Sequence, residues 1–242
     1  MMFAFGLFFG PNDWVMIPGL LLGIYAQIKL SAAYSHYAQV DAVSGMTGAQ
    51  AAREILDDAG LAGMQVIEVP GHLTDHYDPV KRALFLSSEN YHSGSIAALG
   101  VAGHEAGHAL QHKAAYAPLQ WRMTLVPAFG FASTAVWFIV FGGLLLSMLH
   151  FISPAIYAKL LGVAIGLFAV VTLFQIITLP VEFDASRRAK EQLLRLGLIH
   201  QQEGAAVSKV LNAAALTYVA AMVAGVLELM RLIMIAPSVN RN

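Results

Sequence analysis

The sequence predicts a mainly α-helical membrane protein with about four transmembrane helices and a small α+β unit. Two features of the composition support this class: 57% of the 242 residues are hydrophobic, and only 12% are charged. Soluble domains carry about 25% charged residues, so this chain lacks the polar surface that such a domain needs. The third observation is a set of four apolar stretches. Each is close to the length of about 20 residues that a helix needs to cross a bilayer core of about 30 Å.

The four predicted spans are residues 14–30, 125–149, 156–179 and 211–235. Residues 1–14 contain no Lys or Arg and no small-residue cleavage site, so we expect no cleaved signal peptide and an uncleaved first helix. Pro18 is compatible with a transmembrane helix. Glu228 and Arg231 lie three residues apart in the last span and can pair on one helix face.

The region between the first two spans has ordinary polar content and predicts the α+β unit. Residues 46–60 form an amphipathic pattern in which Thr47 is the N-cap and Gln50 completes a capping box. Residues 64–69 and 82–87 are typical of short strands, separated by a turn-rich segment at 70–79, and a helix begins near residue 93. The predicted organisation is therefore 1–33, a transmembrane helix; 34–124, the α+β unit; 125–180, a transmembrane hairpin; 181–210, a helix; and 211–242, a transmembrane helix.

The distribution of cations predicts the orientation in the membrane. Eleven of the fourteen Lys and Arg residues lie between the first and second spans or between the third and fourth. Cytoplasmic loops carry this excess, so we expect a multi-pass protein of the cytoplasmic membrane whose polar segments face the cytoplasm. The net charge of −1 gives no reason to expect a nucleic-acid partner.

The segment VAGHEAGHALQH, residues 101–112, contains the chemistry. His104 and His108 lie four residues apart and share a helix face, with Glu105 beside them. In the H-E-x-x-H pattern the two histidines bind zinc and the glutamate is the general base. A helix of buried or membrane-lining histidines is the simpler alternative, but a charged Glu105 buried in this apolar segment would be costly without a cation. The chain contains no cysteine, so His, Asp or Glu must hold any metal.

A third ligand must come from elsewhere, since zinc in catalytic sites usually has three protein ligands. His112 is eight residues from His104, about 12 Å along a helix, so we expect it beside the site or on the surface. Two spans after His108 return the chain to the same side of the membrane, where Glu182 and Asp184 are the first carboxylates. They project about 200° apart on a helix, so only one can face the metal. The simpler alternative is that both are carboxylates favoured near a helix N-terminus.

Three segments resemble a known family. The stretches VPGHLTDHYDP, LSSENYHSGSIAALGVAGHEAGHALQH and LPVEFDASRRA resemble the YugP-like membrane zinc metallopeptidases of bacteria, and more distantly the HtpX-type and CAAX prenyl protease gluzincins. The resemblance implies a zincin-like catalytic unit, with Zn²⁺ held by His104, His108 and Glu182 and with Glu105 as the base. Ser186 stands where the wider group usually has an aspartate that steadies a ligand histidine.

Other residues are weaker candidates. His72 and His76 lie in the 70–79 segment, which either lines the cleft or is a turn with local hydrogen bonds. Leu84, Phe85 and Leu86 lie on the second strand, which pairs with an extended peptide if it is the sheet edge and packs on the helix if it is core. Gly162 and Gly166 form a small-residue pair that suits either a membrane partner, such as a second copy, or packing within the chain.

The sequence therefore favours a membrane-anchored zinc-dependent endopeptidase that acts on a protein or peptide substrate and contacts membrane lipid. One alternative is a zinc-binding membrane scaffold or adaptor without proteolysis. Another is a site-2-type intramembrane protease, which needs about 20 apolar residues around His104 and a downstream Asp-Gly motif. Residues 95–103 are too short for that span, and no Asp-Gly pair occurs.

Overall fold

The structure is a computed structural model that describes residues 12–239, with side chains to residue 236. The expectation of no cleaved signal peptide depends mainly on residues 1–11, which lie outside the described residues. The chain divides into two compact units. We call residues 26–120 and 179–217 the sheet unit, and the described parts of 1–25, 121–178 and 218–242 the apolar unit.

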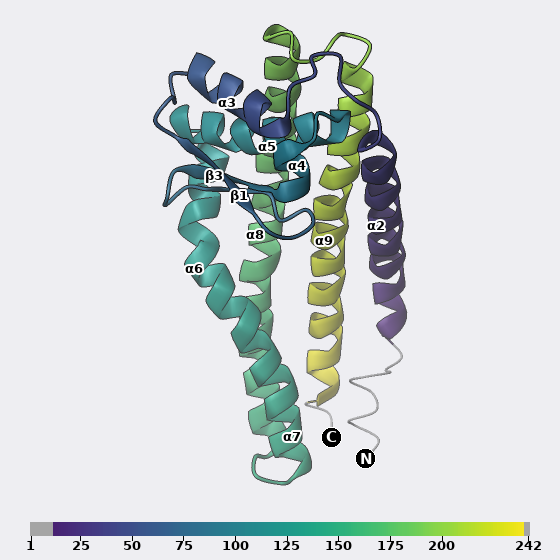
Figure 1. The fold of residues 1–242 in the computed structure, drawn as a ribbon. Helices are drawn as coiled ribbons and strands as arrows, with labels where there is room; N and C mark the ends of the chain where they lie inside the picture. The colour runs from purple at the N-terminus through teal and green to yellow at the C-terminus, as the bar shows by residue number, and fades with distance from the viewer. Residues whose placement is uncertain (1–11, 240–242) are drawn as a thin grey trace. The chain divides into compact units, whose positions relative to one another are not determined.

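The sheet unit contains all the described strands and is mixed α and β. Its strands are β1 (Gln65–Val69), β2 (His76–Asp78) and β3 (Ala83–Ser87), and the short helices α3 (Gly48–Asp58) and α4 (Ser88–His92) and the longer α5 (Ile96–Lys113) accompany them (Figure 1). The strand order is β1-β3-β2, with β1 parallel and β2 antiparallel to β3. The predicted order of helix, strand, loop, strand and helix is present, with an additional strand, β2, in the loop and an additional short helix, α4, before α5.

Local signals explain where the helices of the sheet unit begin. The Thr47 hydroxyl accepts from the Gln50 amide at 3.2 Å, and the Gln50 side chain accepts from the Thr47 amide at 2.9 Å, so the predicted capping box is confirmed. Ser95 caps α5 in the same way by accepting from the Ala98 amide at 3.1 Å. The buried face of α3, which includes Ile55 and Leu56, joins one core with α5 and β3.

Strand β3 lies in the middle of the sheet, and all five of its residues are buried. The interpretation of this strand as a sheet edge that pairs with substrate through Leu84, Phe85 and Leu86 is therefore wrong, because β1 and β2 already occupy its two sides. The turn before it explains the difference. The Asp78 carboxylate accepts from the amides of Val80 and Lys81 at 2.8 and 2.9 Å, which reverses the chain and lets β2 pair back onto β3.

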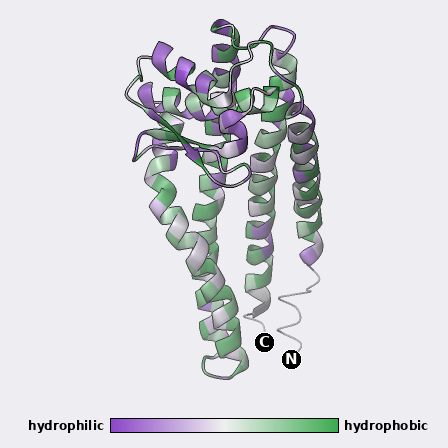
Figure 2. Ribbon diagram, viewed as in Figure 1, coloured by the Kyte–Doolittle hydropathy of each residue, from purple (hydrophilic) through white to green (hydrophobic). Residues whose placement is uncertain are grey.

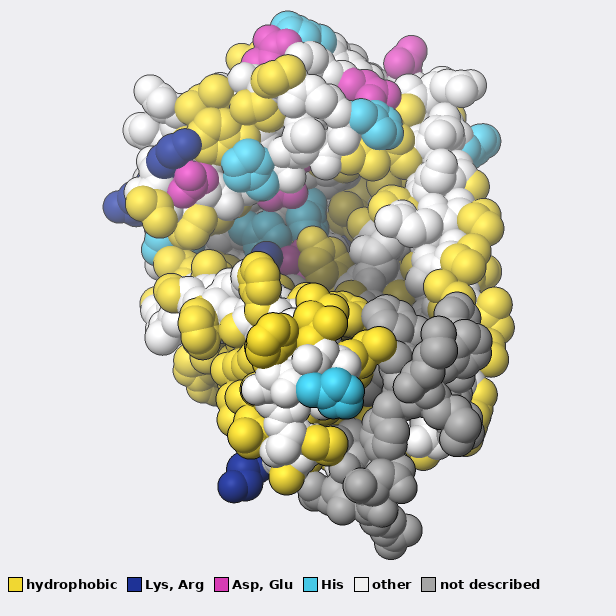
Figure 3. Space-filling model, turned by 90° about the horizontal axis from the view of Figure 1, so that it is seen from below, with side chains coloured by type: hydrophobic (Ala, Val, Ile, Leu, Met, Phe, Trp, Pro, Cys, Tyr) yellow, Lys and Arg dark blue, Asp and Glu magenta, His cyan; other side chains and the backbone are white. Residues whose placement is uncertain are grey.

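Four described helices are long and apolar enough to cross a membrane, as the sequence predicts. They are Asp13–Tyr37, Ala117–Met148, Pro154–Arg195 and Gly204–Ala236. Hydrophobic residues dominate these helices, and hydrophilic residues gather in the sheet unit (Figure 2). The face seen in Figure 3 likewise shows many hydrophobic and few charged side chains over its lower part. The helices are longer than the apolar stretches that predict them.

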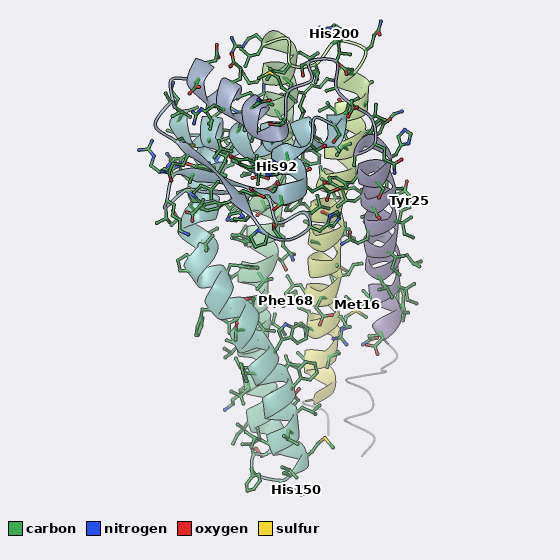
Figure 4. All side chains as sticks on the ribbon, in the orientation of Figure 1. Met16, Tyr25, His92, His150, Phe168 and His200 are labelled. Carbon is green, nitrogen blue, oxygen red and sulfur yellow. The ribbon has the colours of Figure 1, made fainter. Side chains whose placement is uncertain are left out.

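The long helices are built from the remaining elements. These are the 3₁₀ turn η1 (Asp13–Met16), α2 (Ile17–Tyr37), α6 (Ala117–Trp137), the π-helical turn η2 (Phe138–Gly142), α7 (Gly143–Met148), α8 (Pro154–Arg195) and α9 (Gly204–Val239). His150, labelled in Figure 4, lies in the turn between α7 and α8. Helix α8 is continuous through Pro180 for 42 residues, so the third predicted span and the helix expected after residue 181 are one element.

A core and one ion-pair cluster organise the apolar unit. Val136, Leu161 and Leu232 belong to a single buried cluster from α6, α8 and α9. The predicted pair in α9 forms: Arg231 lies 2.7 Å from Glu228 and also 3.0 Å from Asp13 of η1. An added Cβ at Gly162 or Gly166 would meet nothing within 4 Å, so these two glycines do not bring another described helix close.

Candidate metal centre

Three side chains meet in the sheet unit with the geometry of a metal site. His104 and His108 lie one turn apart on α5, and their rings are 4.8 Å apart between centroids. The Nε2 atoms of the two histidines lie 3.1 and 3.6 Å from Oε2 of Glu182 on α8. The ligand atoms of all three residues lie within 4.8 Å of one another. The expected convergence of these three residues is thus present.

The close crossing of α5 and α8 brings Glu182 to the histidines. A Cβ built on Gly107 would lie 2.5 Å from the carbonyl oxygen of Ala185. Because only glycine allows two backbones to approach so closely, Gly107 lets the helices cross one residue before His108 and three residues after Glu182. Glu182 is only 2% exposed there. A buried carboxylate needs a counter-charge, which a cation held between it and the two imidazoles would supply.

Each histidine has a protein partner on its other ring nitrogen. Nδ1 of His104 lies 3.1 Å from the hydroxyl of Ser186, and Nδ1 of His108 lies 3.0 Å from Oε1 of Gln111. Histidines that bind zinc characteristically use one nitrogen for the metal and the other for such a partner. Two imidazoles, one carboxylate and an open fourth position form a set that Zn²⁺ accepts. The residues present therefore fit the metal that the H-E-x-x-H pattern predicts.

Glu105 lies beside the three donors but is not one of them. Its side chain is 8% exposed, and burial raises its pKa to about 7 from an ordinary value of 4.5. The nearby charges of Glu182 and Asp75 add to the increase, while His104 and a hydrogen bond from the Tyr77 backbone amide oppose it. A carboxyl group with a pKa near 7 can both take and return a proton at neutral pH.

Asp184 faces away from the donors. Its carboxylate accepts from the Gln111 side-chain amide at 3.0 Å and pairs with Arg187 and Arg188. The two carboxylates therefore point in different directions, as the offset of about 200° between positions 182 and 184 predicts, and Glu182 faces the histidines.

The other predicted candidates lie outside the donor group. His112 contacts the Tyr77 hydroxyl at 2.7 Å, and this contact ties the end of α5 to β2. His72 is exposed and lies 2.9 Å from Glu89. His76 is exposed, stacks on Phe85 with ring centroids 4.8 Å apart, and contacts the Thr74 carbonyl. Neither histidine of the 70–79 segment contacts the donors.

The 70–79 segment is held by Asp75 rather than by its histidines. The Asp75 carboxylate accepts from the Ser87 amide at 2.8 Å and from the Asn90 side chain at 2.9 Å. Asn90 in turn accepts from the hydroxyl of Tyr34 at 2.8 Å. His92, labelled in Figure 4, lies on α4 beside these residues and contacts Glu68 at 3.1 Å. This network ties the 70–79 segment to the end of β3 and to α4.

Sequence reasoning missed two contributors to the site. Gln111 is fully buried and joins His108 to α8. Its position three residues after His108, on the helix face that carries the two histidines, is a signal that could have identified it. Tyr77 contributes through its backbone amide, which contacts Glu105, and through its hydroxyl, which contacts His112. Both contacts depend on the pairing of β2 with β3, which the sequence alone does not show.

Comparisons with known proteins agree with these observations. No solved structure matches the chain. A relative from Bacillus subtilis (strain 168) named "Putative membrane protease YugP" is 45% identical over 222 residues, which is 92% of this chain and 95% of the relative. A family model described as "Putative neutral zinc metallopeptidase" matches residues 13–237. The resemblance seen in the sequence is confirmed, and the chain belongs to this zinc metallopeptidase family.

Proposed function

We propose that the protein is a membrane-anchored, zinc-dependent endopeptidase in which His104, His108 and Glu182 hold Zn²⁺ and Glu105 is the general base. The observation that carries this proposal is the convergence of three ligand atoms from α5 and α8 within 4.8 Å of one another. The zincin-like character of the sheet unit rests on the same arrangement and on the resemblance to the gluzincins.

The residues around the site divide the chemistry between them. Zinc, when bound, supplies a Lewis acid that polarises a carbonyl and lowers the pKa of water. Glu105 accepts a proton from the attacking water and delivers it to the leaving amine. Its near-complete burial keeps bulk water from competing for that proton.

Strand β2 is the surface best suited to receive an extended peptide. It is an edge of the sheet, and Tyr77 connects it to the site through its amide contact with Glu105 and its hydroxyl contact with His112. A peptide that pairs with this edge would be recognised largely through its main chain, which favours broad sequence selectivity. This assignment replaces β3, which has no free edge.

The apolar helices anchor the protein in lipid, and the cation distribution favours an active site that faces the cytoplasm. Helix α5 is not among the four described candidate spans, which argues against a site-2-type protease with its motif inside the bilayer. A zinc-binding scaffold shares the metal site and differs only in lacking turnover.

The test is cleavage of casein and of quenched-fluorescence peptides by the purified protein in detergent. We expect cleavage that stops with 1,10-phenanthroline and returns with added Zn²⁺. Metal analysis of the same preparation separates the alternatives. Zinc at one ion per chain with no cleavage of any substrate would support the scaffold, and chelator-insensitive cleavage would contradict a zinc peptidase.

A further inference from the structure

The side chain of Gln111 lies fully buried between α5 and α8 and makes three hydrogen bonds. Its Nε2 donates to the backbone carbonyl of Val181 at 2.7 Å and to the Asp184 carboxylate at 3.0 Å. Its Oε1 lies 3.0 Å from Nδ1 of His108. The Gln111 amide therefore contacts His108, which is a candidate ligand, and Val181, which precedes the candidate ligand Glu182. It also contacts Asp184, whose carboxylate does not face the metal position.

The chemistry of these partners leaves the amide only one orientation. A backbone carbonyl and an ionised carboxylate accept hydrogen bonds and cannot donate them, so both require the NH₂ side of Gln111. Arg187 and Arg188 pair with Asp184 and keep it ionised. The carbonyl oxygen of Gln111 must then face His108, where it can only accept.

That orientation determines the proton on His108. Since Gln111 Oε1 accepts, Nδ1 of His108 must carry the hydrogen. In the neutral ring Nε2 is then unprotonated, and this atom is the one that faces Glu182 at 3.6 Å. Ser186, the partner of His104, has a hydroxyl that can donate or accept, so it imposes no such choice.

We propose that Gln111 and Asp184 are positioning residues that hold His108 in the Nδ1–H tautomer and aim its Nε2 at the metal. Through the Val181 carbonyl, the same amide fixes the turn of α8 that presents Glu182. This inference rests on the proposed zinc site and concerns residues that contact neither the metal nor the reacting atoms.

The first experiment compares Gln111→Met with Gln192→Met. Both substitutions replace a glutamine with a methionine of similar size, but Gln192 is an α8 residue whose side chain bonds only Arg195 in the described contacts. Zinc affinity is measured on metal-free protein in detergent by competition with a chromophoric chelator. We expect about 10–100-fold weaker binding in Q111M, the range for outer partners of zinc ligands, and wild-type binding in Q192M.

A second experiment tests the direction of the hydrogen bonds. Gln111→Glu keeps an acceptor for His108 but faces Asp184 with a second carboxylate, so zinc binding should weaken. In the double variant Q111E/D184N, the new amide at position 184 can donate to the new carboxylate. Recovery of at least half of the lost affinity, on a logarithmic scale, is expected. A role in packing alone predicts no recovery.

The visible spectrum of the Co²⁺-substituted protein provides a reading independent of activity. Q111M should change the absorption bands, because the geometry at one imidazole changes, and Q192M should not. If Q111M does not fold, Gln111→Glu carries the test, since it removes both NH donors and nearly keeps the size of the side chain. Wild-type zinc affinity and an unaltered spectrum in Q111M or, failing that, Q111E would overturn this inference alone. Absence of zinc binding in the wild type would overturn it together with the proposed function.

Discussion

Nε2 of His104 lies 3.1 Å from Oε2 of Glu182, although 78 residues separate the two in the sequence. One whole candidate span, Ala117–Met148, and most of a second, Pro154–Arg195, lie between them, yet both residues belong to the same compact unit. An imidazole and a carboxylate that meet beside a second imidazole offer two neutral nitrogen donors and one anionic oxygen. The anionic oxygen belongs to Glu182, and the first prediction tests its role.

Glu182→Gln should abolish stable zinc binding, because it replaces the anionic donor with a neutral amide. Outer partners alone contribute about 10–100-fold in metal affinity, so loss of a direct ligand should exceed about 100-fold. The matched control is Glu191→Gln on the same helix, an exposed residue that pairs with Arg187. Zinc content after dialysis, measured by plasma mass spectrometry, provides the comparison. Equal zinc in the two variants would show that Glu182 is not a ligand.

Glu105→Gln should retain zinc and lose peptidase activity. Glu105 is outside the donor group, so the metal stays, but an amide cannot take up the proton. General-base catalysis contributes about 10²–10⁴-fold in rate, and kcat should fall by that amount. Glu54→Gln, on the exposed side of α3, should leave kcat unchanged. A zinc-loaded E105Q variant with wild-type turnover would assign the base elsewhere.

Gly107→Ala should separate α5 from α8. The added methyl would lie 2.5 Å from the Ala185 carbonyl oxygen, and a backbone atom cannot rotate away. Overpacking of this kind costs about 1–3 kcal/mol and would displace Glu182 from the histidines. Gly100→Ala on the same helix is the control, because its nearest contact is the Val207 side chain at 3.6 Å. That variant should gain up to about 1 kcal/mol in helix propensity. Thermal unfolding and zinc content together distinguish the two.

The stability of the metal-free protein should depend on pH through Glu105. The pKa of Glu105 is about 7 in the folded state, above its ordinary 4.5, so folding favours the protonated form. This contribution is fully present below pH 4.5 and is lost as the pH rises to about 7. The difference in pKa corresponds to about 3 kcal/mol. The stability of the wild type relative to E105Q should therefore decline across this interval, as thermal unfolding in detergent can measure. Parallel curves for the two proteins would contradict a perturbed carboxyl at this position.

Local patterns were sufficient for much of the fold and of the candidate site. The capping box at Thr47, the four apolar helices and the one-turn spacing of the histidines depend on neighbouring residues, and these features can be read from short windows. The place of Glu182 depended on counting spans and on the family resemblance, because no local pattern distinguishes it from Asp184.

Strand order and long-range hydrogen bonds could not be predicted in the same way. Strand β2 has only three residues and depends on the turn at Asp78 and on the contact between Tyr77 and His112. The central place of β3 did have a signal. Its residues read ALFLS with little alternation, which is typical of a strand buried on both faces. The role of Gln111 requires knowledge of which turn of α8 crosses α5, and a glycine, Gly107, marks that crossing.

The order of the donors along the chain has a consequence for biosynthesis. His104 and His108 leave the ribosome early, whereas Glu182 follows only after 117–148 and most of α8 have been made. A nascent chain that stops between these points has the base and two imidazoles but lacks the third donor. On the proposed function, a chain that stops before Glu182 could not assemble a working peptidase, and activity would arise only after this part of α8 has been made.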